Sequence, residues 1–160
     1  MAPPPNLDAL LETRIYPGMS MAESRILRSW IARHGAEWDA IDVEPRLGAG
    51  KLLSPHFDEK MRADWERRTR ARPDAICTRL PNVALIIEAK EQATSEAVWQ
   101  VLGYADLYRA EEPRAELRTL IVCAEAHPTA VSVARGRGVQ ILKYLIPPEE
   151  PLAPGTEAAP

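Results

Sequence analysis

An uninterrupted apolar run from Val83 to Ile87, rich in β-branched residues, indicates where the centre of the fold lies. Short runs of this kind are typical of a strand that is covered on both faces of a sheet. Pro81-Asn82 provides a turn directly before the run, and residues 69–79 precede that turn. We therefore predict that residues 69–79 and the apolar run form two strands of a hairpin. Such a hairpin would bring Asp74 close to Glu88.

Acidic and basic groups follow the apolar run in alternation. Side chains alternate along a strand, so Glu88 and Lys90 should project to one face and Ala89 to the other. Mg²⁺ takes oxygen ligands, commonly one or two carboxylates, and fills its other positions with water and substrate phosphate. Asp74 and Glu88 are the predicted metal ligands, and the Ala89 carbonyl could add a further oxygen.

A lysine beside such a metal has a definite chemical use. Lys90 could orient or deprotonate an attacking water, or balance the charge that builds on a phosphate. Two carboxylates and a lysine in this arrangement predict metal-assisted hydrolysis of a phosphodiester.

The same residues resemble the signature of the PD-(D/E)XK nuclease superfamily. Pro73-Asp74 is similar to its first element and Glu88-Ala89-Lys90 to its second, with Glu88 standing 14 positions after Asp74. The resemblance extends over residues 22–146, although its specific motifs occupy only residues 72–104. It implies a restriction-endonuclease-like α/β fold, in which helices flank a central mixed β-sheet of four to five strands in the order αβββαβαβ.

Two further site residues are expected on a helix after the hairpin. Gln100 and Tyr104 form a Gln-x-x-x-Tyr pair, similar to the additional motif of the RecB-type branch of that superfamily. One helical turn separates them, so both can lean towards Glu88 and Lys90 and position the substrate. The alternative is an interface helix in which both side chains are buried and hydrogen-bonded.

Glu23 is a candidate for an additional acidic group at the metal. The resemblance implies that the first core helix carries an acidic residue facing the site, and Glu23 occupies that helix. Ser20 and Glu23 also form a capping-box pattern, so Glu23 could instead serve only to cap the helix. The two interpretations have equal weight at this point.

Periodicity and turn residues predict the order of the elements. A nuclease domain is expected at residues 20–146, after a partly disordered extension at 1–19 and before a disordered tail at 147–160, which holds five prolines and three glutamates. The expected helices cover 6–14, 20–35, 94–109 and 127–136, the expected strands cover 38–46, 69–79, 83–90, 117–124 and 139–146, and residues 54–65 are irregular or partly helical.

Basic residues gather immediately before the predicted metal site. The stretch from Lys60 to Arg79 holds seven basic and three acidic residues, although the whole chain has a net charge of −3. Such a strip could neutralise phosphates, and a solvated surface is the equally weighted alternative. Trp65 could stack on a base, but packing in the core is favoured. The predicted nucleic-acid-binding residues are Arg67, Arg68, Arg70 and Arg72.

Composition and cysteine count indicate which classes of protein this chain can belong to. With 46% hydrophobic and 27% charged residues, the 160-residue chain is typical of a globular domain, without an apolar run that could cross a membrane or a signal peptide. The two cysteines, Cys77 and Cys123, are expected to be buried free thiols. Two cysteines are too few for the four thiolates of an iron–sulfur cluster. We expect a cytoplasmic protein without a cluster.

The leading hypothesis is a Mg²⁺-dependent deoxyribonuclease, with Mn²⁺ as a substitute metal. The resemblance and the small size are typical of an accessory or phage-type DNA-processing nuclease, acting with a protein partner or as a homodimer. One alternative is a catalytically silent nucleic-acid or protein-binding module of the same fold. Another is a small nuclease similar to Holliday-junction resolvases, for which a symmetric dimer is expected.

Overall fold

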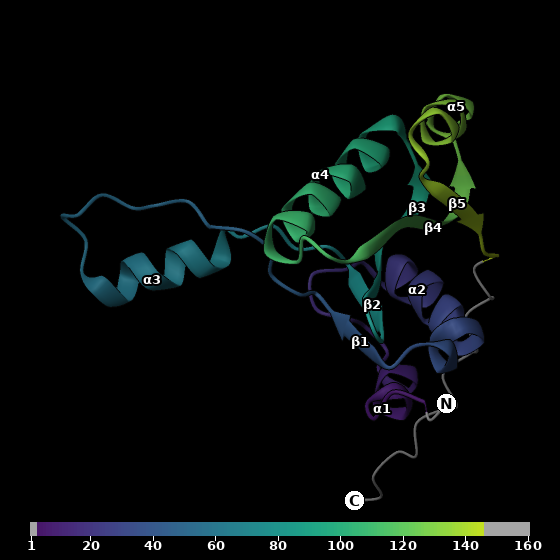
Figure 1. Ribbon diagram of the computed structural model, residues 1–160, viewed down its shortest axis with the longest axis horizontal. Coiled ribbons are helices and arrows are strands. Elements are labelled where there is room, and N and C mark those ends of the chain that lie inside the picture. Colours follow the sequence, from purple (N-terminus) through teal and green to yellow (C-terminus); the bar gives the residue numbers. More distant parts are fainter. Residues whose placement is uncertain (1–2, 146–160) are drawn as a thin grey trace, which may run out of the picture.

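A five-stranded mixed sheet flanked by helices forms the body of the protein (Figure 1). The computed structural model describes residues 3–145. Its helices are α1 (Leu7–Glu12), α2 (Met21–His34), the 3₁₀ helix η1 (Gly35–Glu37), α3 (Glu59–Arg68), α4 (Ser95–Glu111) and α5 (Pro128–Arg137). Its strands are β1 (Ala40–Val43), β2 (Ala75–Arg79), β3 (Val83–Ala93), β4 (Glu116–Ala126) and β5 (Gln140–Lys143).

The strands lie side by side in chain order, β1-β2-β3-β4-β5. The first three strands pair antiparallel, whereas β3, β4 and β5 pair parallel through the crossovers α4 and α5. Parallel neighbours need such crossovers because the chain must return to the opposite end of the sheet before the next strand begins. The predicted α/β class, with a mixed sheet flanked by helices, is confirmed.

Strand β3 is buried on both faces, as its apolar run predicts. Leu85 and Ile87 pack into the core that α2 covers, and Ile86 packs into the core beneath α4 and α5. Both cores exclude water from the middle of the sheet, which is the main contribution to stability in such a layered fold. Glu88, the next residue, is therefore carried into a largely apolar environment.

Local signals fix where the helices begin and end. Ser20 caps α2 in a complete capping box with Glu23, as predicted. Pro128 stands in the first turn of α5, and Gly138 ends that helix with a φ of +71°, a conformation that favours glycine. Cys77 and Cys123 are both buried and free, which confirms that prediction.

The second strand is shorter than predicted, and this matters for the site. It begins at Ala75 rather than at residue 69, because residues 46–72 leave the sheet and form a projecting segment around α3. An isolated bridge between Leu47 and Ala71 joins the two ends of that segment. Asp74 consequently lies just before β2 and not within it. The first and last strands are also shorter than predicted, at Ala40–Val43 and Gln140–Lys143.

The termini of the body differ in what the structure describes. Helix α1 packs Leu7, Leu10 and Leu11 against the core on the α2 side of the sheet. The predicted tail at 147–160 lies outside the described residues. Within residues 3–145, no helix is both long enough and apolar enough to cross a membrane.

Candidate active site

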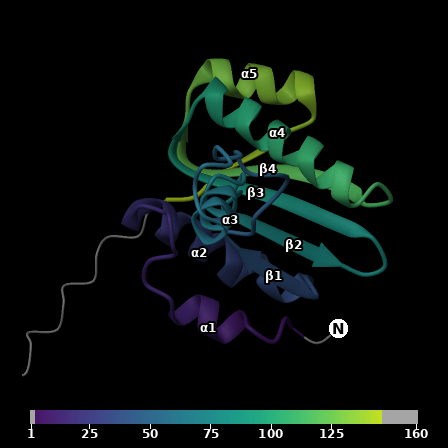
Figure 2. The same cartoon turned by 90° about the vertical axis from the view of Figure 1, so that its left-hand side faces the viewer.

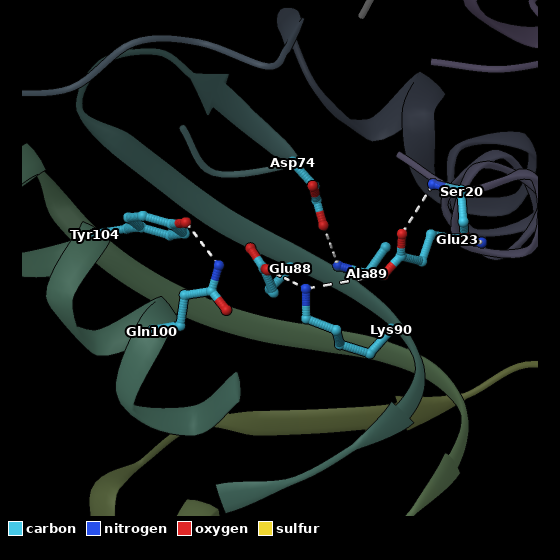
Figure 3. Close-up of polar contacts among 8 residues, drawn as sticks. All are labelled: Ser20, Glu23, Asp74, Glu88, Ala89, Lys90, Gln100 and Tyr104. Atoms are coloured by element: carbon cyan, nitrogen blue, oxygen red, sulfur yellow. Dashed lines mark hydrogen bonds and ion pairs between the residues drawn. The ribbon is translucent and has the colours of Figure 1, made fainter. Parts of the chain in front are cut away.

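The predicted catalytic and metal-binding residues lie together where β1 ends, β2 begins and β3 continues past both (Figure 3). The register of the antiparallel pair places Ala75 opposite Ile87, so the preceding Asp74 comes opposite Glu88. The backbone N–H of Glu44 donates to the Asp74 carbonyl at 3.0 Å, which extends the pairing of β1 with β2 by one step. Asp74 and Glu88 thus lie close together, as the predicted hairpin required.

Asp74 is held by the backbone of the central strand. Its Oδ2 accepts a hydrogen bond from the Ala89 N–H at 2.7 Å. Burial raises the pKa of Asp74 to about 6; the Ala89 hydrogen bond and Lys90 act to lower it, while Glu23 and Glu44 raise it further. In an extended strand the N–H and C=O of one residue point to the same side, so the Ala89 carbonyl also faces the side on which Asp74 lies.

Glu88 is unusual because it has an ionisable side chain and yet only 1% of the residue is exposed to solvent. Its Oε1 lies 2.6 Å from Lys90 Nζ. Its Oε2 is buried and has no hydrogen-bond partner among the described residues. Burial, and then the charge of Asp74, raise the pKa of Glu88 to about 7, against the opposing effect of Lys90. Unsatisfied buried carboxylate oxygens are rare and costly, and they call for an explanation.

Lys90 links the acidic groups of the site. Besides Glu88, its Nζ lies 3.8 Å from Glu23 Oε1. Burial alone would lower the pKa of Lys90, but the hydrogen bond to Glu88 and the charges of Glu88, Asp74 and Glu23 outweigh it and raise the pKa. Lys90 is therefore an ammonium group at neutral pH in this arrangement, which suits charge balance better than proton abstraction.

Glu23 caps α2 and also lies within ion-pair distance of Lys90. Its Oε2 accepts a hydrogen bond from the Ser20 N–H at 2.9 Å and completes the capping box. Its Oε1 faces Lys90. The same carboxylate thus caps α2 and contributes negative charge to the site (Figure 3).

Gln100 and Tyr104 approach from α4, on the face of the sheet that this helix covers. Gln100 Nε2 donates to Tyr104 Oη at 2.8 Å. Burial raises the pKa of Tyr104, the hydrogen bond from Gln100 lowers it, and Glu88 and Asp74 raise it again. The phenol is therefore neutral and can donate its own proton, so the pair presents polar neutral groups beside the carboxylates (Figure 3).

One acidic residue near the site was missed in the sequence. Glu44 has a φ of +57°, which is uncommon for a residue other than glycine, and its charge raises the pKa of Asp74. Its Oε1 pairs with Arg72 at 3.3 Å, and it lies against Gly18, where an added Cβ would be 2.0 Å from the same oxygen. The available signal was its position directly after the strand residues Ile41 and Val43.

The four predicted nucleic-acid-binding arginines lie outside this cluster, on or beside α3. Arg67 and Arg68 pair with Asp64 on the same helix, and Arg70 lies 3.8 Å from Glu66. Arg72 pairs with Glu44 at the edge of the site. The predicted core packing of Trp65 is wrong: its side chain is 43% exposed, because α3 projects away from both cores.

The residues fit a hard divalent cation with few protein ligands. Within residues 3–145 there is no group of three or more His, Cys, Asp or Glu side chains arranged to hold a metal ion. Lys90 lies between Glu88 and Glu23, which leaves Asp74 and Glu88 as the carboxylate pair. Mg²⁺ commonly takes only one or two carboxylates. Because Glu88 Oε2 has no hydrogen-bond partner among the described residues, a cation beside it would satisfy this buried oxygen.

Comparison with known proteins gives a limited result. No protein-family model matches the sequence, and no curated protein matches it. The fold is similar to a complex of EndoMS with double-stranded DNA, at 14% identity and a TM-score of 0.49, covering 86% of this chain and 51% of that one. It is also similar to a repair endonuclease from Pyrococcus abyssi, at 18% identity and a TM-score of 0.45, covering 84% and 50%. The chain spans about half the length of these proteins.

Proposed function

We propose that this protein is a divalent-metal-dependent deoxyribonuclease that hydrolyses phosphodiester bonds. One observation carries the proposal: among the described residues, a buried carboxylate oxygen of Glu88 has no hydrogen-bond partner, and Glu88 interacts electrostatically with Asp74, which is itself desolvated. A purely structural acid at this place would be expected to satisfy both of its oxygens. The resemblance of the motif residues to the PD-(D/E)XK signature supports the same chemistry.

Asp74 and Glu88 would hold Mg²⁺ or Mn²⁺, with the Ala89 carbonyl as a further ligand. When bound, such an ion polarises a phosphoryl oxygen and lowers the pKa of a coordinated water. Asp74 is kept in place by the Ala89 N–H, so its carboxylate is preorganised rather than mobile. Burial of both acids removes competing water from the ligand oxygens.

Lys90 supplies fixed positive charge next to the scissile phosphate in this scheme. Its ammonium group is positioned by Glu88 and Glu23 on two sides, so little reorganisation is needed when negative charge builds on the phosphate. Gln100 and Tyr104 would donate hydrogen bonds that orient a phosphate or a water molecule. Lys90 is not assigned the removal of a proton from the attacking water, because its pKa is raised.

A cleavage assay with a matched variant tests the proposal. Purified protein is incubated with single-stranded, duplex, flapped and four-way-junction DNA, with Mg²⁺, with Mn²⁺ or with EDTA, beside a Lys90→Ala preparation. We expect metal-dependent cutting that Lys90→Ala reduces by orders of magnitude. Preferential cutting of the four-way junction by a stable dimer would favour the resolvase-like alternative. Equal cutting by wild type and Lys90→Ala would refute the assignment.

The silent-module alternative also has an observation in its favour. Lys90 already partly neutralises Glu88 at 2.6 Å, and the described residues offer no cluster of three metal-binding side chains. A module of that kind would fold and bind without responding to divalent ions. An unchanged melting temperature on addition of Mg²⁺ or Mn²⁺, together with the absence of cutting, would favour it.

A further inference from the structure

Residues 46–72 form a segment, here called the arm, that stands away from the body of the protein (Figure 1). It contains α3 and the long connection that precedes this helix. In the view from its own side, the arm lies in front of the body rather than within one of its layers (Figure 2). An extension of this kind has to be held by its base alone.

The base of the arm is firmly attached to the body. Leu47 is buried in the core beneath α4, and its N–H donates to the Ala71 carbonyl at 2.8 Å. The Gly48 N–H donates to Glu111 Oε1 at the end of α4, at 2.6 Å. Gly50 lies so close to α3 that an added Cβ would be 1.7 Å from the Glu66 carbonyl oxygen. These contacts fix the base of the arm and therefore the direction in which it projects from the body.

The chain path places the arm beside the candidate active site. It begins two residues after Glu44 and ends two residues before Asp74, and the charge of Glu44 raises the pKa of Asp74. Arg72, its last residue, pairs with Glu44. The base of the arm consequently lies at the edge of the candidate active site.

Charge distinguishes the arm from the rest of the molecule. The arm holds eight basic and four acidic residues, a net charge of +4, whereas the remaining chain holds twelve basic and nineteen acidic residues, a net charge of −7. A polyanion is attracted by net positive charge, which the arm carries and the remaining chain does not. If DNA reaches the site, the arm is the element with the charge to bring it there.

The arm also exposes apolar and aromatic side chains that belong to neither core cluster. Trp65 is 43% exposed and Met61, one turn before it, is 49% exposed. Arg62 also lies one turn from Trp65 and has no ion-pair partner within residues 3–145, unlike Arg67 and Arg68. An exposed tryptophan beside an unpaired arginine is suited to a nucleic-acid base and its phosphate.

We propose that the arm binds a single-stranded segment of the nucleic-acid substrate, with Trp65 stacking on an unpaired base and Arg62 contacting the backbone. This inference deepens the proposed nuclease function, from which it takes the class of ligand. Bases within a duplex are already stacked on each other, so an aromatic side chain gains this contact with unpaired bases. The substrate class would then be DNA with a single-stranded stretch next to the cleaved bond.

Binding without cleavage tests the inference. Fluorescence anisotropy measures the Kd for labelled oligo(dT) and for a duplex of equal length in EDTA, with wild type, Trp65→Ala, Trp65→Phe and Arg62→Ala. Trp99→Ala is the control, since Trp99 is 50% exposed and lies under Arg137 on the far helices α4 and α5. We expect Trp65→Ala to weaken oligo(dT) binding about tenfold, Trp65→Phe to restore most of it, and Trp99→Ala to change nothing. Arg62→Ala should weaken the binding of both oligo(dT) and the duplex. It should also reduce the slope of log Kd against log salt concentration by about one.

The outcomes separate the inference from the function on which it builds. Wild-type affinity of Trp65→Ala for oligo(dT) would overturn the inference even if the wild-type protein cuts DNA. Loss of self-association in Trp65→Ala, seen by sedimentation with DNA affinity intact, would assign the arm to a second copy of the chain and also overturn it. Trp65-dependent binding by a protein that cuts nothing with any metal would uphold the inference and refute the nuclease function.

Discussion

Lys90 Nζ lies 2.6 Å from one carboxylate oxygen of Glu88, while the other oxygen of the same carboxylate is buried without a partner among the described residues. The lysine thus pairs with one carboxylate oxygen of Glu88 and leaves the other oxygen available. A carboxylate used only for stability would gain by satisfying both oxygens. The asymmetry of this pair is the structural basis of the proposed metal site.

Stability of the metal-free protein should fall as the pH rises. Burial raises the pKa of Asp74 from 3.8 to about 6 and that of Glu88 from 4.5 to about 7. At pH values between the unfolded and the folded pKa of each acid, the folded state binds more protons than the unfolded state. The free energy of unfolding therefore decreases as the pH rises through this range. We expect the melting temperature in EDTA to be lower at pH 8 than at pH 5 by about 5 °C or more. Glu88→Gln should flatten this dependence, whereas Glu91→Gln, an exposed neighbour on β3, should keep it.

Divalent ions should reverse that loss of stability. At pH 8 both acids are largely ionised, and a ligand that binds only the folded state stabilises it. Mg²⁺ or Mn²⁺ at ten times its Kd should stabilise by about 1.4 kcal/mol, which raises the melting temperature by several degrees. Asp74→Asn should abolish the shift, and Asp106→Asn, a change of an exposed acid on α4, should retain it. A full shift in Asp74→Asn would place the bound ion elsewhere.

Two substitutions of Glu23 should separate its two contacts. Glutamine can still accept from the Ser20 N–H, but it removes the negative charge near Lys90. We expect Glu23→Gln to keep the stability of the wild type and to lose cleavage rate by several-fold. Glu23→Ala should show the same loss of rate and, in addition, a destabilisation of about 1 kcal/mol from the missing cap. Wild-type cleavage by Glu23→Gln would mean that the residue only caps α2.

The direction of the arm should depend on Gly50. An alanine Cβ there would overlap the Glu66 carbonyl oxygen at 1.7 Å, a backbone atom that cannot rotate away. We expect Gly50→Ala to shift the arm and to weaken binding of single-stranded DNA several-fold, with little change in the melting temperature of the body. Gly136→Ala is the control, because nothing lies within 4 Å of a Cβ at that position. Binding as tight as in the wild type would show that the arm does not need this contact.

Local sequence signals were sufficient for the sheet and for the neighbourhood of the acids. The apolar run at Val83–Ile87 and the turn before it determine the hairpin, and the hairpin register then brings Asp74 opposite Glu88. The capping box at Ser20 and Glu23 was likewise readable, because such caps depend on residues only three positions apart.

Features that depend on distant parts of the chain were not predictable. Residues 69–72 resemble the start of a strand, but they form the end of the arm, where Ala71 makes an isolated bridge to Leu47 instead of joining β2. The Asp58 cap of α3 was an available signal for a helix in that region. The shared role of the Glu23 carboxylate and the positive φ of Glu44 arise from packing against other elements, and no local pattern encodes them.

The most direct test of a metal site at Glu88 compares two glutamates three positions apart on β3. The rate of DNA cleavage with Mg²⁺ is measured under single-turnover conditions for wild type, Glu88→Gln and Glu91→Gln, with melting curves to confirm folding. We predict that Glu88→Gln folds and loses cleavage by orders of magnitude, while Glu91→Gln cleaves like the wild type. Cleavage by folded Glu88→Gln at the rate of the wild type would contradict the proposed site.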